Sequence, residues 1–185
     1  MRKQWALLAG AVMIILSGCG NSNTPNQEHT ANSSQQHDTS EMNHSTSSEL
    51  PAGLQEAEHP AFKVGSQAII RADHMPGMNG AKATIVGAYS TTAYTVSYTP
   101  TTGGEKVTNH KWVIHEEIKD AGSEPYAPGT EVILAADHMK GMDRAKATID
   151  SAESTTVYMV DYTPTTGGEP VKNHKWVTES ELSAN

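Results

Sequence analysis

Histidine and methionine recur in this chain in a pattern that suits a soft metal ion. A His-Met-x-x-Met segment occurs twice, and an Asn-His pair follows each copy about 35 residues later. Thioethers favour Cu(I), and imidazole accepts several transition metals. One segment and one later histidine would form a three- or four-coordinate site, with Asp73 or Asp137 orienting the imidazole. The candidate ligands are His74, Met75, Met78, His110, His138, Met139, Met142 and His174.

A packing role explains the same residues and stays open as an alternative. Methionine in a loop often fills gaps at the edge of a small core, and a histidine there can bond a backbone carbonyl. A weaker candidate lies further upstream, where His37, Met42 and His44 stand in a polar segment. That segment also reads as a solvated linker that happens to contain histidine.

The candidate residues belong to an internal duplication. Residues 65–118 match residues 129–182 at a constant offset of 64 (129 − 65), and 34 of the 54 aligned pairs are identical. Each copy is long enough for a small domain, so the sequence predicts tandem domains rather than a solenoid. We expect repeat domain 1 over 59–121 and repeat domain 2 over 122–185.

Each repeat is predicted to be mainly β. In repeat 1, residues 67–71, 81–86, 92–99, 106–107 and 112–115 are β-prone, and the third run alternates apolar and polar residues. Five short strands with one long early loop predict a small SH3-like barrel, with an OB-like barrel or an open sheet as the alternative. The expected cores are Ile69, Ile85, Val96, Val107 and Trp112 in repeat 1, and Ile133, Ile149, Val160, Val171 and Trp176 in repeat 2.

The N-terminus has the pattern of an export signal. A positive start is followed by an apolar run of about 12 residues, shorter than the about 20 that cross a bilayer. Leu16-Ser17-Gly18-Cys19 looks like a lipobox and contains the only cysteine. We therefore expect a signal peptide over 1–18, lipidation of Cys19 at the outer face of a bacterial membrane, and a disordered tether over 19–58.

Composition excludes several other functions. The net charge is −8 and becomes −10 without Arg2 and Lys3 (11 basic minus 21 acidic residues), so the chain lacks the basic surface that nucleic acids require. A single cysteine rules out an internal disulfide or a Cys-based metal cluster. The mature domains have no cysteine nucleophile, nucleophile elbow or phosphate-binding glycine loop, so we expect no enzymatic activity.

The lipobox, the His-rich linker and the doubled pattern Ala-Asp-His-Met-x-Gly-Met … Tyr-Thr-Pro-Thr-Thr-Gly-Gly-Glu … Asn-His-Lys-Trp-Val resemble the YdhK-type lipoproteins of bacilli and related Gram-positive bacteria. The resemblance covers nearly the whole chain. It implies lipid anchoring outside the cell and a tandem domain of unknown function, and it implies no activity.

These observations support three hypotheses for a lipid-anchored, non-catalytic surface protein. The first is binding of Cu(I) or another soft metal, with the ion buffered or passed to a membrane-protein partner. The second is an SH3-like module that binds wall polymer or peptide through exposed aromatic residues. The third is a scaffold for another protein, which requires an exposed apolar patch.

Overall fold

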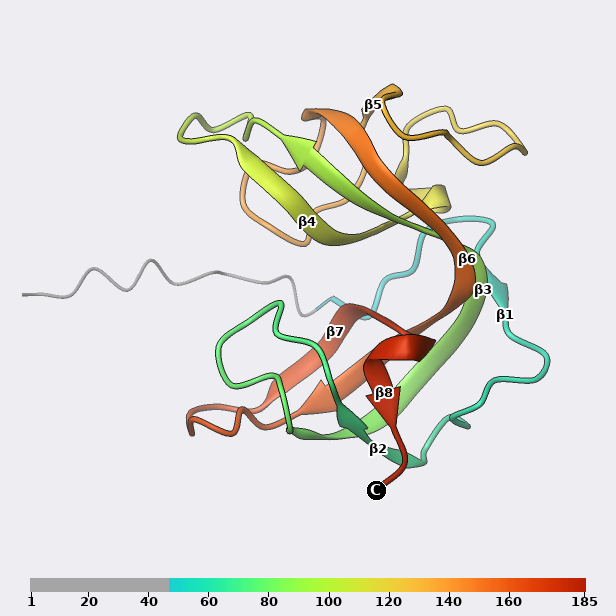
Figure 1. Cartoon of the computed structure of the whole chain (residues 1–185), viewed down its shortest axis with the longest axis vertical. Coiled ribbons are helices and arrows are strands. Elements are labelled where there is room, and N and C mark those ends of the chain that lie inside the picture. The colour runs from blue at the N-terminus through green and yellow to red at the C-terminus, as the bar shows by residue number, and fades with distance from the viewer. Residues whose placement is uncertain (1–46) are drawn as a thin grey trace, which may run out of the picture. The chain divides into compact units, whose positions relative to one another are not determined.

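The computed structural model describes residues 47–185, which are mainly β as the sequence predicts (Figure 1). Cys19 and the tether residues His37, Met42 and His44 lie outside the described residues. None of the helical segments within 47–185 is long or apolar enough to cross a membrane. The elements are β1 (Gln55–Glu56), β2 (Gln67–Ile70), β3 (Lys82–Tyr98), β4 (Val107–Ile114), η1 (His115–Glu117), β5 (Glu131–Ile133), β6 (Lys146–Tyr162), β7 (Val171–Thr178), η2 (Glu179–Glu181) and β8 (Leu182–Ser183).

Two strands, β3 and β6, are far longer than the others, with 17 residues each. The sequence predicts two strands in the β3 region, at 81–86 and 92–99, and this prediction is wrong. The residues between them include Thr91 and Thr92, whose β-branched side chains favour extended backbone. No proline interrupts the run, and every residue from Gly87 to Thr95 has a partner on β6.

Strands β3 and β6 pair antiparallel along almost their whole length, from Ala83 opposite Tyr162 to Tyr98 opposite Ala147. Because the pairing is antiparallel, the first half of β3 lies beside the second half of β6. We call this end lobe A; it also contains β2, β7 and β8. The opposite end, lobe B, holds the second half of β3, the first half of β6, β4 and β5 (Figure 1).

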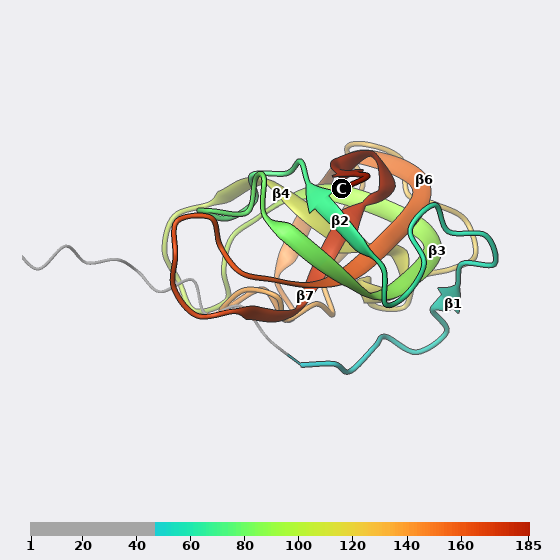
Figure 2. The same ribbon diagram turned by 90° about the horizontal axis from the view of Figure 1, so that it is seen from below.

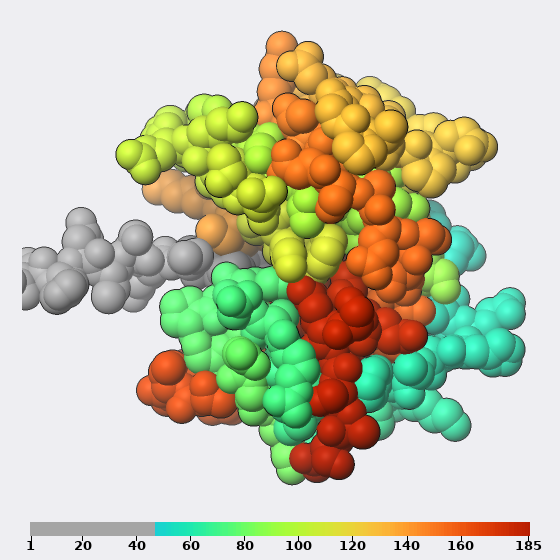
Figure 3. Space-filling view, in the orientation of Figure 1, coloured from blue at the N-terminus to red at the C-terminus, as the bar shows by residue number. Residues whose placement is uncertain are grey.

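Each lobe is therefore built from both repeats. Figure 2 views the molecule from below, where β2 and β3 of repeat 1 lie with β6 and β7 of repeat 2. In the space-filling view, the C-terminal residues contact the loop that precedes β3, at one end of the molecule (Figure 3). A backbone bond from Arg71 N–H to the Glu181 carbonyl (2.7 Å) and the pairing of Ile70 with Leu182 join the two repeats in lobe A.

The hydrophobic core of each lobe also contains residues from both repeats. In lobe A, Ile70, Met78 and Ile85 of repeat 1 pack with Tyr158 and Val160 of repeat 2. In lobe B, the second half of repeat 1 packs with the first half of repeat 2. This core contains Tyr94, Val96, Tyr98, Val113, Leu134, Met142 and Ile149. The sequence boundary between the repeats consequently does not separate the two cores.

Several of the predicted core positions need correction. Ile85 and Val96 lie in different lobes rather than in one core, and likewise Ile149 and Val160. Ile69 and Ile133 are only half-buried, while their neighbours Ile70 and Leu134 are fully buried. Alternate strand residues face opposite sides, so a shift of one residue exchanges the buried and exposed sets. Val107 and Val171 are also half-buried and pack at the core edge.

The tryptophans were correctly predicted to be buried, but they form a third cluster at the junction between the lobes. Tyr89 meets Trp176 edge-on, with ring centroids 5.7 Å apart. The other members of this junction cluster are Ala93, Trp112, Ile114, Val157 and Met159. The junction is therefore apolar.

The exchange predicts which core residues are energetically coupled. Ile85 and Val160 face each other across the strand pair although they belong to different repeats. In urea unfolding, Ile85→Val and Val160→Ala should be non-additive by about 1 kcal/mol, because each changes the packing available to the other. Ile85→Val combined with Val96→Ala, in the other lobe, should be additive within about 0.5 kcal/mol. The opposite pattern would contradict the shared cores.

Candidate functional site

The His-Met loop of each repeat is held by the hairpin turn of the other repeat. Thr165 donates its backbone N–H to the Gly77 carbonyl (2.8 Å), and Thr101 does the same to Gly141 (2.8 Å). Gly77 has φ +75°, and a Cβ there would lie 2.5 Å from Thr166 Oγ1. The glycine in the loop is thus required both by its backbone conformation and by close packing.

The loop in lobe A presents His74 to a buried carboxylate. His74 Nε2 lies 2.8 Å from Glu181 Oε1. The second carboxylate oxygen accepts hydrogen bonds from the Trp112 indole N–H (2.8 Å) and the Thr178 backbone N–H (3.1 Å). Glu181 is therefore held by three hydrogen-bond donors, two from repeat 1 and one from repeat 2, and Lys111 Nζ of repeat 1 lies 3.6 Å from Oε1.

Lobe B repeats this arrangement with the repeats exchanged. His138 Nε2 lies 2.6 Å from Glu117 Oε1. The Trp176 indole N–H donates to the same carboxylate at 3.1–3.2 Å, and the Ile114 backbone N–H at 3.1 Å. The two carboxylate–imidazole pairs are thus built in the same way.

The surroundings of Glu181 favour its ionised form. Burial alone would raise the pKa of this carboxyl. The hydrogen bond and charge of His74, with the bonds from Trp112 and Thr178, outweigh burial and lower the pKa to about 2. A carboxylate that accepts at Oε1 places the imidazole proton on Nε2 when His74 is neutral.

In that tautomer, the other ring nitrogen carries a lone pair. Nδ1 of His74 and Nδ1 of His138 are both buried, and neither has a hydrogen-bond partner. Buried polar atoms without a partner are uncommon and call for an explanation. A ring that donates one N–H to a carboxylate and keeps its second nitrogen open has the arrangement typical of a metal-ligating histidine.

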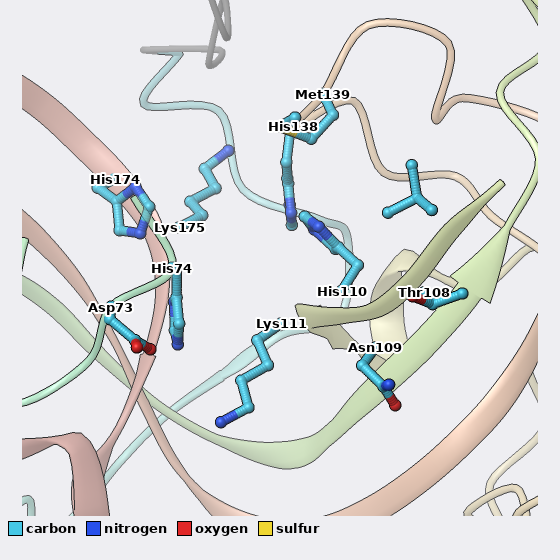
Figure 4. A pocket seen from close by; sticks show the side chains of 11 residues that line it. Asp73, His74, Thr108, Asn109, His110, Lys111, His138, Met139, His174 and Lys175 are labelled. Atoms are coloured by element: carbon cyan, nitrogen blue, oxygen red, sulfur yellow. The ribbon is translucent and has the colours of Figure 1, made fainter. Parts of the chain in front are cut away.

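A second histidine stands beside each of these rings. The rings of His74 and His174 have centroids 6.5 Å apart, and those of His110 and His138 are also 6.5 Å apart. His174 meets the Tyr162 ring edge-on, and His110 meets the Tyr98 ring edge-on. All four histidines line one cleft of about 440 Å³, which we call the histidine cleft (Figure 4). The other lining residues are Asp73, Val107, Thr108, Asn109, Lys111, Met139 and Lys175.

The structure changes the predicted grouping of these ligands. The sequence pattern predicts that His74 shares a site with His110 of the same repeat, whereas the ring next to His74 is His174 of the other repeat. The carboxylate that orients His74 is Glu181 and not Asp73. Within residues 47–185, no three His, Cys, Asp or Glu side chains form a group suited to hold one metal ion.

The methionines divide into two kinds. Met78 and Met142 are fully buried members of the lobe cores, so the packing interpretation explains their place. Met75 packs at the edge of the lobe A core, and its sulfur accepts a hydrogen bond from the Tyr162 hydroxyl at 3.5 Å. Met139 packs at the edge of the lobe B core and lines the cleft.

The two glutamates that hold the site, Glu117 and Glu181, are not among the site residues predicted from the sequence. A signal was available: Glu117 and Glu181 are equivalent positions (181 − 117 = 64) and identical, while the three residues before them differ between the repeats.

Among residues 47–185, the aromatic side chains expected to form a groove for wall polymer or peptide are buried. Trp112 and Trp176 are buried, and so are Tyr94 and Tyr98. Within the described part of the chain, the exposed large hydrophobic side chains are Leu50 and Val64. Two separate residues do not make the contiguous apolar patch expected of a protein scaffold.

Fold and site together define a class of protein: a tandem β protein whose repeats exchange halves and share a histidine cleft. The family model described as "Protein of unknown function (DUF1541)" matches residues 64–115 and 128–179. The chain therefore belongs to the DUF1541 family, with two tandem copies of its domain.

Relatives from Bacillus subtilis agree with this assignment. The chain is 60% identical over 178 residues to the uncharacterized protein YdhK of strain 168, covering 96% of this chain and 87% of that protein. A crystal structure of YdhK matches with a TM-score of 0.76 at 67% identity, covering 79% of this chain and 99% of that one. A solution structure of the YdhK C-terminal domain matches with a TM-score of 0.64 at 70% identity, covering 67% and 94%.

The site predicts how stability depends on pH. Because the pKa of Glu181 is lowered from 4.5 to about 2, its ionised form stabilises the fold above about pH 4.5, and this contribution is lost as the pH falls towards 2. Glu181→Gln should lower the free energy of unfolding by about 3 kcal/mol at pH 7 and by little near pH 2. Urea unfolding at both pH values measures the difference.

Asp143→Asn is the matched control. Asp143 contacts Arg144 at the exposed surface (3.0 Å), so its loss should change stability by less than about 1 kcal/mol at either pH. An equal effect of the two substitutions at pH 7 would contradict the proposed importance of the buried carboxylate.

Proposed function

We propose that this protein is a lipid-anchored, non-catalytic protein at the outer face of a bacterial membrane, and that it binds a soft metal ion, Cu(I), in the histidine cleft. The observation that carries the proposal is the pair of buried Nδ1 atoms on His74 and His138. Each lacks a hydrogen-bond partner while the opposite nitrogen of its ring meets a fixed carboxylate.

The spacing of the rings supports two ligands for each ion. A metal–nitrogen bond is about 2 Å long, so two imidazoles that share one ion have ring centres roughly 5–6.5 Å apart. The observed 6.5 Å lies at the wide end of this range, which corresponds to an ion nearly in line between two nitrogens. A low coordination number with neutral nitrogen ligands suits Cu(I) better than Ca²⁺ or Mg²⁺, which require several oxygen ligands.

The charge around the cleft also supports a monovalent cation. Glu117, Glu181 and Asp73 at the cleft outnumber Lys111 and Lys175 by one negative charge (3 − 2), and Lys111 Nζ lies 3.6 Å from Glu181 Oε1. Met139 places a thioether in the cleft lining, where it can add a soft third ligand. We propose that the ion is held for buffering or for transfer to a membrane-protein partner.

A Cu(I) titration of the fragment 47–185 against a competing chelator, under reducing conditions, tests this function. We expect one or two equivalents to bind tightly. The double variant His74→Gln and His138→Gln should lose this binding, because glutamine keeps an N–H for the carboxylate but removes the imidazole lone pair. Circular dichroism confirms that the variant remains folded.

Two controls distinguish the cleft from nonspecific binding. His59→Asn removes an exposed histidine that does not line the cleft, and Met78→Leu with Met142→Leu roughly preserves core volume. Both should bind Cu(I) as the unchanged fragment does. A folded fragment that binds no Cu(I) would refute the proposed function.

Lipid anchoring is tested separately in cells. The unchanged chain should fractionate with the membrane, and its N-terminal peptide should carry a diacylglyceryl group on Cys19 in mass spectrometry. Cys19→Ser removes the thiol that forms the thioether, so the chain should appear in the medium, since stable anchoring requires the two acyl chains. Membrane retention of the variant would contradict a lipid anchor.

A further inference from the structure

The pairing of β3 with β6 has an internal two-fold symmetry. Thr91 lies opposite Thr155, and these are the same position in the two repeats (155 − 91 = 64). The pairs on either side obey the same relation: where residue i pairs with residue j, residue j − 64 pairs with residue i + 64. The two bulges obey it as well, because the skipped residues are Val86 on β3 and Asp150 on β6 (150 − 86 = 64). The two repeats therefore use equivalent strand positions when they pair with each other.

We infer that repeat 1 carries a self-complementary pairing surface that fits a second copy of repeat 1, whereas two copies of repeat 2 form a less stable pair. The occupant proposed for this surface is thus another copy of the same unit. The inference concerns how the repeats recognise each other and is independent of metal binding.

The contacts that assemble the cleft are compatible with self-pairing. The loop that contains Gly77 docks on the turn that contains Thr165, and Gly141 docks on the turn that contains Thr101. The loop glycine and the Pro-Thr-Thr-Gly-Gly turn are identical in both repeats. The histidines, glutamates and tryptophans of the site are also identical at the offset of 64. Two copies of repeat 1 would therefore recreate both histidine pairs, each completed by the other copy.

The bulges decide between the two kinds of self-pairing. In the present chain, Ser97 donates a hydrogen bond to Asp150 Oδ2 (2.7 Å) across the strand pair. The equivalents of these residues are Asp161 and Val86, which form the other bulge. Two copies of repeat 1 would place Ser97 beside Val86, a contact without charge.

Two copies of repeat 2 would instead place Asp161 beside Asp150 at both bulges. Asp150 would lose the hydroxyl donor, and two carboxylates would meet, which destabilises a strand pair. Asp161 already accepts bonds from Lys172 Nζ (2.8 Å) and the Asn173 N–H (2.8 Å), so it is held in place as an ionised group. Burial would raise the pKa of Asp161, but these donors outweigh it and lower the pKa.

The test uses two full-length chains in a Cys19→Ser background. In the first, residues 129–182 carry the sequence of residues 65–118, so the chain contains repeat 1 twice. In the second, residues 65–118 carry the sequence of residues 129–182. We expect the first chain to be a monomer by light scattering and to unfold cooperatively in urea, followed by the fluorescence of the buried tryptophans. The second should unfold at a midpoint lower by about 1 M urea.

A disulfide reports the register directly. Thr91→Cys with Thr155→Cys places two cysteines at opposed positions, where the Cα separation of an antiparallel pair allows a bond. The disulfide should form within one molecule of the unchanged chain and of the chain with repeat 1 twice. Failure of the latter chain to fold or to form this disulfide would overturn the inference.

The carboxylate contact is tested by rescue. In the chain with repeat 2 twice, the residues at positions 97 and 161 are both aspartate, and changing both to serine should raise the urea midpoint. Ser97→Asp alone, in the unchanged chain, should lower it by creating one of the two contacts. An unaltered midpoint in both cases would overturn the explanation for why two copies of repeat 2 form a less stable pair.

Discussion

The pairing of β3 with β6 is the interaction on which the other features depend. It is longer than either lobe, so each strand must leave one core and enter the other. The halves of a repeat are thereby separated, and each half can bury its apolar face only against the complementary half of the other repeat. Stability thus comes from contacts between repeats, without a disulfide or, in the described residues, a long helix.

The same exchange assembles the site. His74 lies on a loop of repeat 1. The carboxylate of Glu181, which contacts His74, and the neighbouring ring of His174 belong to repeat 2. Trp112 of repeat 1 donates a hydrogen bond to the Glu181 carboxylate and fixes its position. Each carboxylate–imidazole pair therefore forms only when the two repeats exchange halves. A repeat alone would leave Glu181 or Glu117 without its histidine and its indole donor. An unpaired buried carboxylate is costly, so the site favours the exchanged arrangement over independent repeats.

Much of this could be predicted from the sequence, and the limits have physical causes. The β class, the duplication, the histidine-bearing loops and the burial of the tryptophans follow from residue type and spacing. The exchange of halves between the repeats does not, because similar repeats offer similar partners. His110 and His174 have nearly the same neighbours in sequence, and only the long strands decide which one lies beside His74. The choice between Ile69 and Ile70 as the core residue also depends on strand register, which neighbouring isoleucines do not specify.

The two kinds of methionine show how packing and chemistry divide one motif. Met78 fills the lobe core and, through the turn at Gly77, sets the path of the loop. His74, four residues earlier, then projects from a loop that is held by the core at Met78 and by the hairpin turn of the other repeat at Gly77. A ring held this firmly, with its Nε2 committed to a carboxylate, loses little conformational entropy when a ligand meets Nδ1. A buried apolar side chain at position 78 therefore helps to place the loop that carries His74.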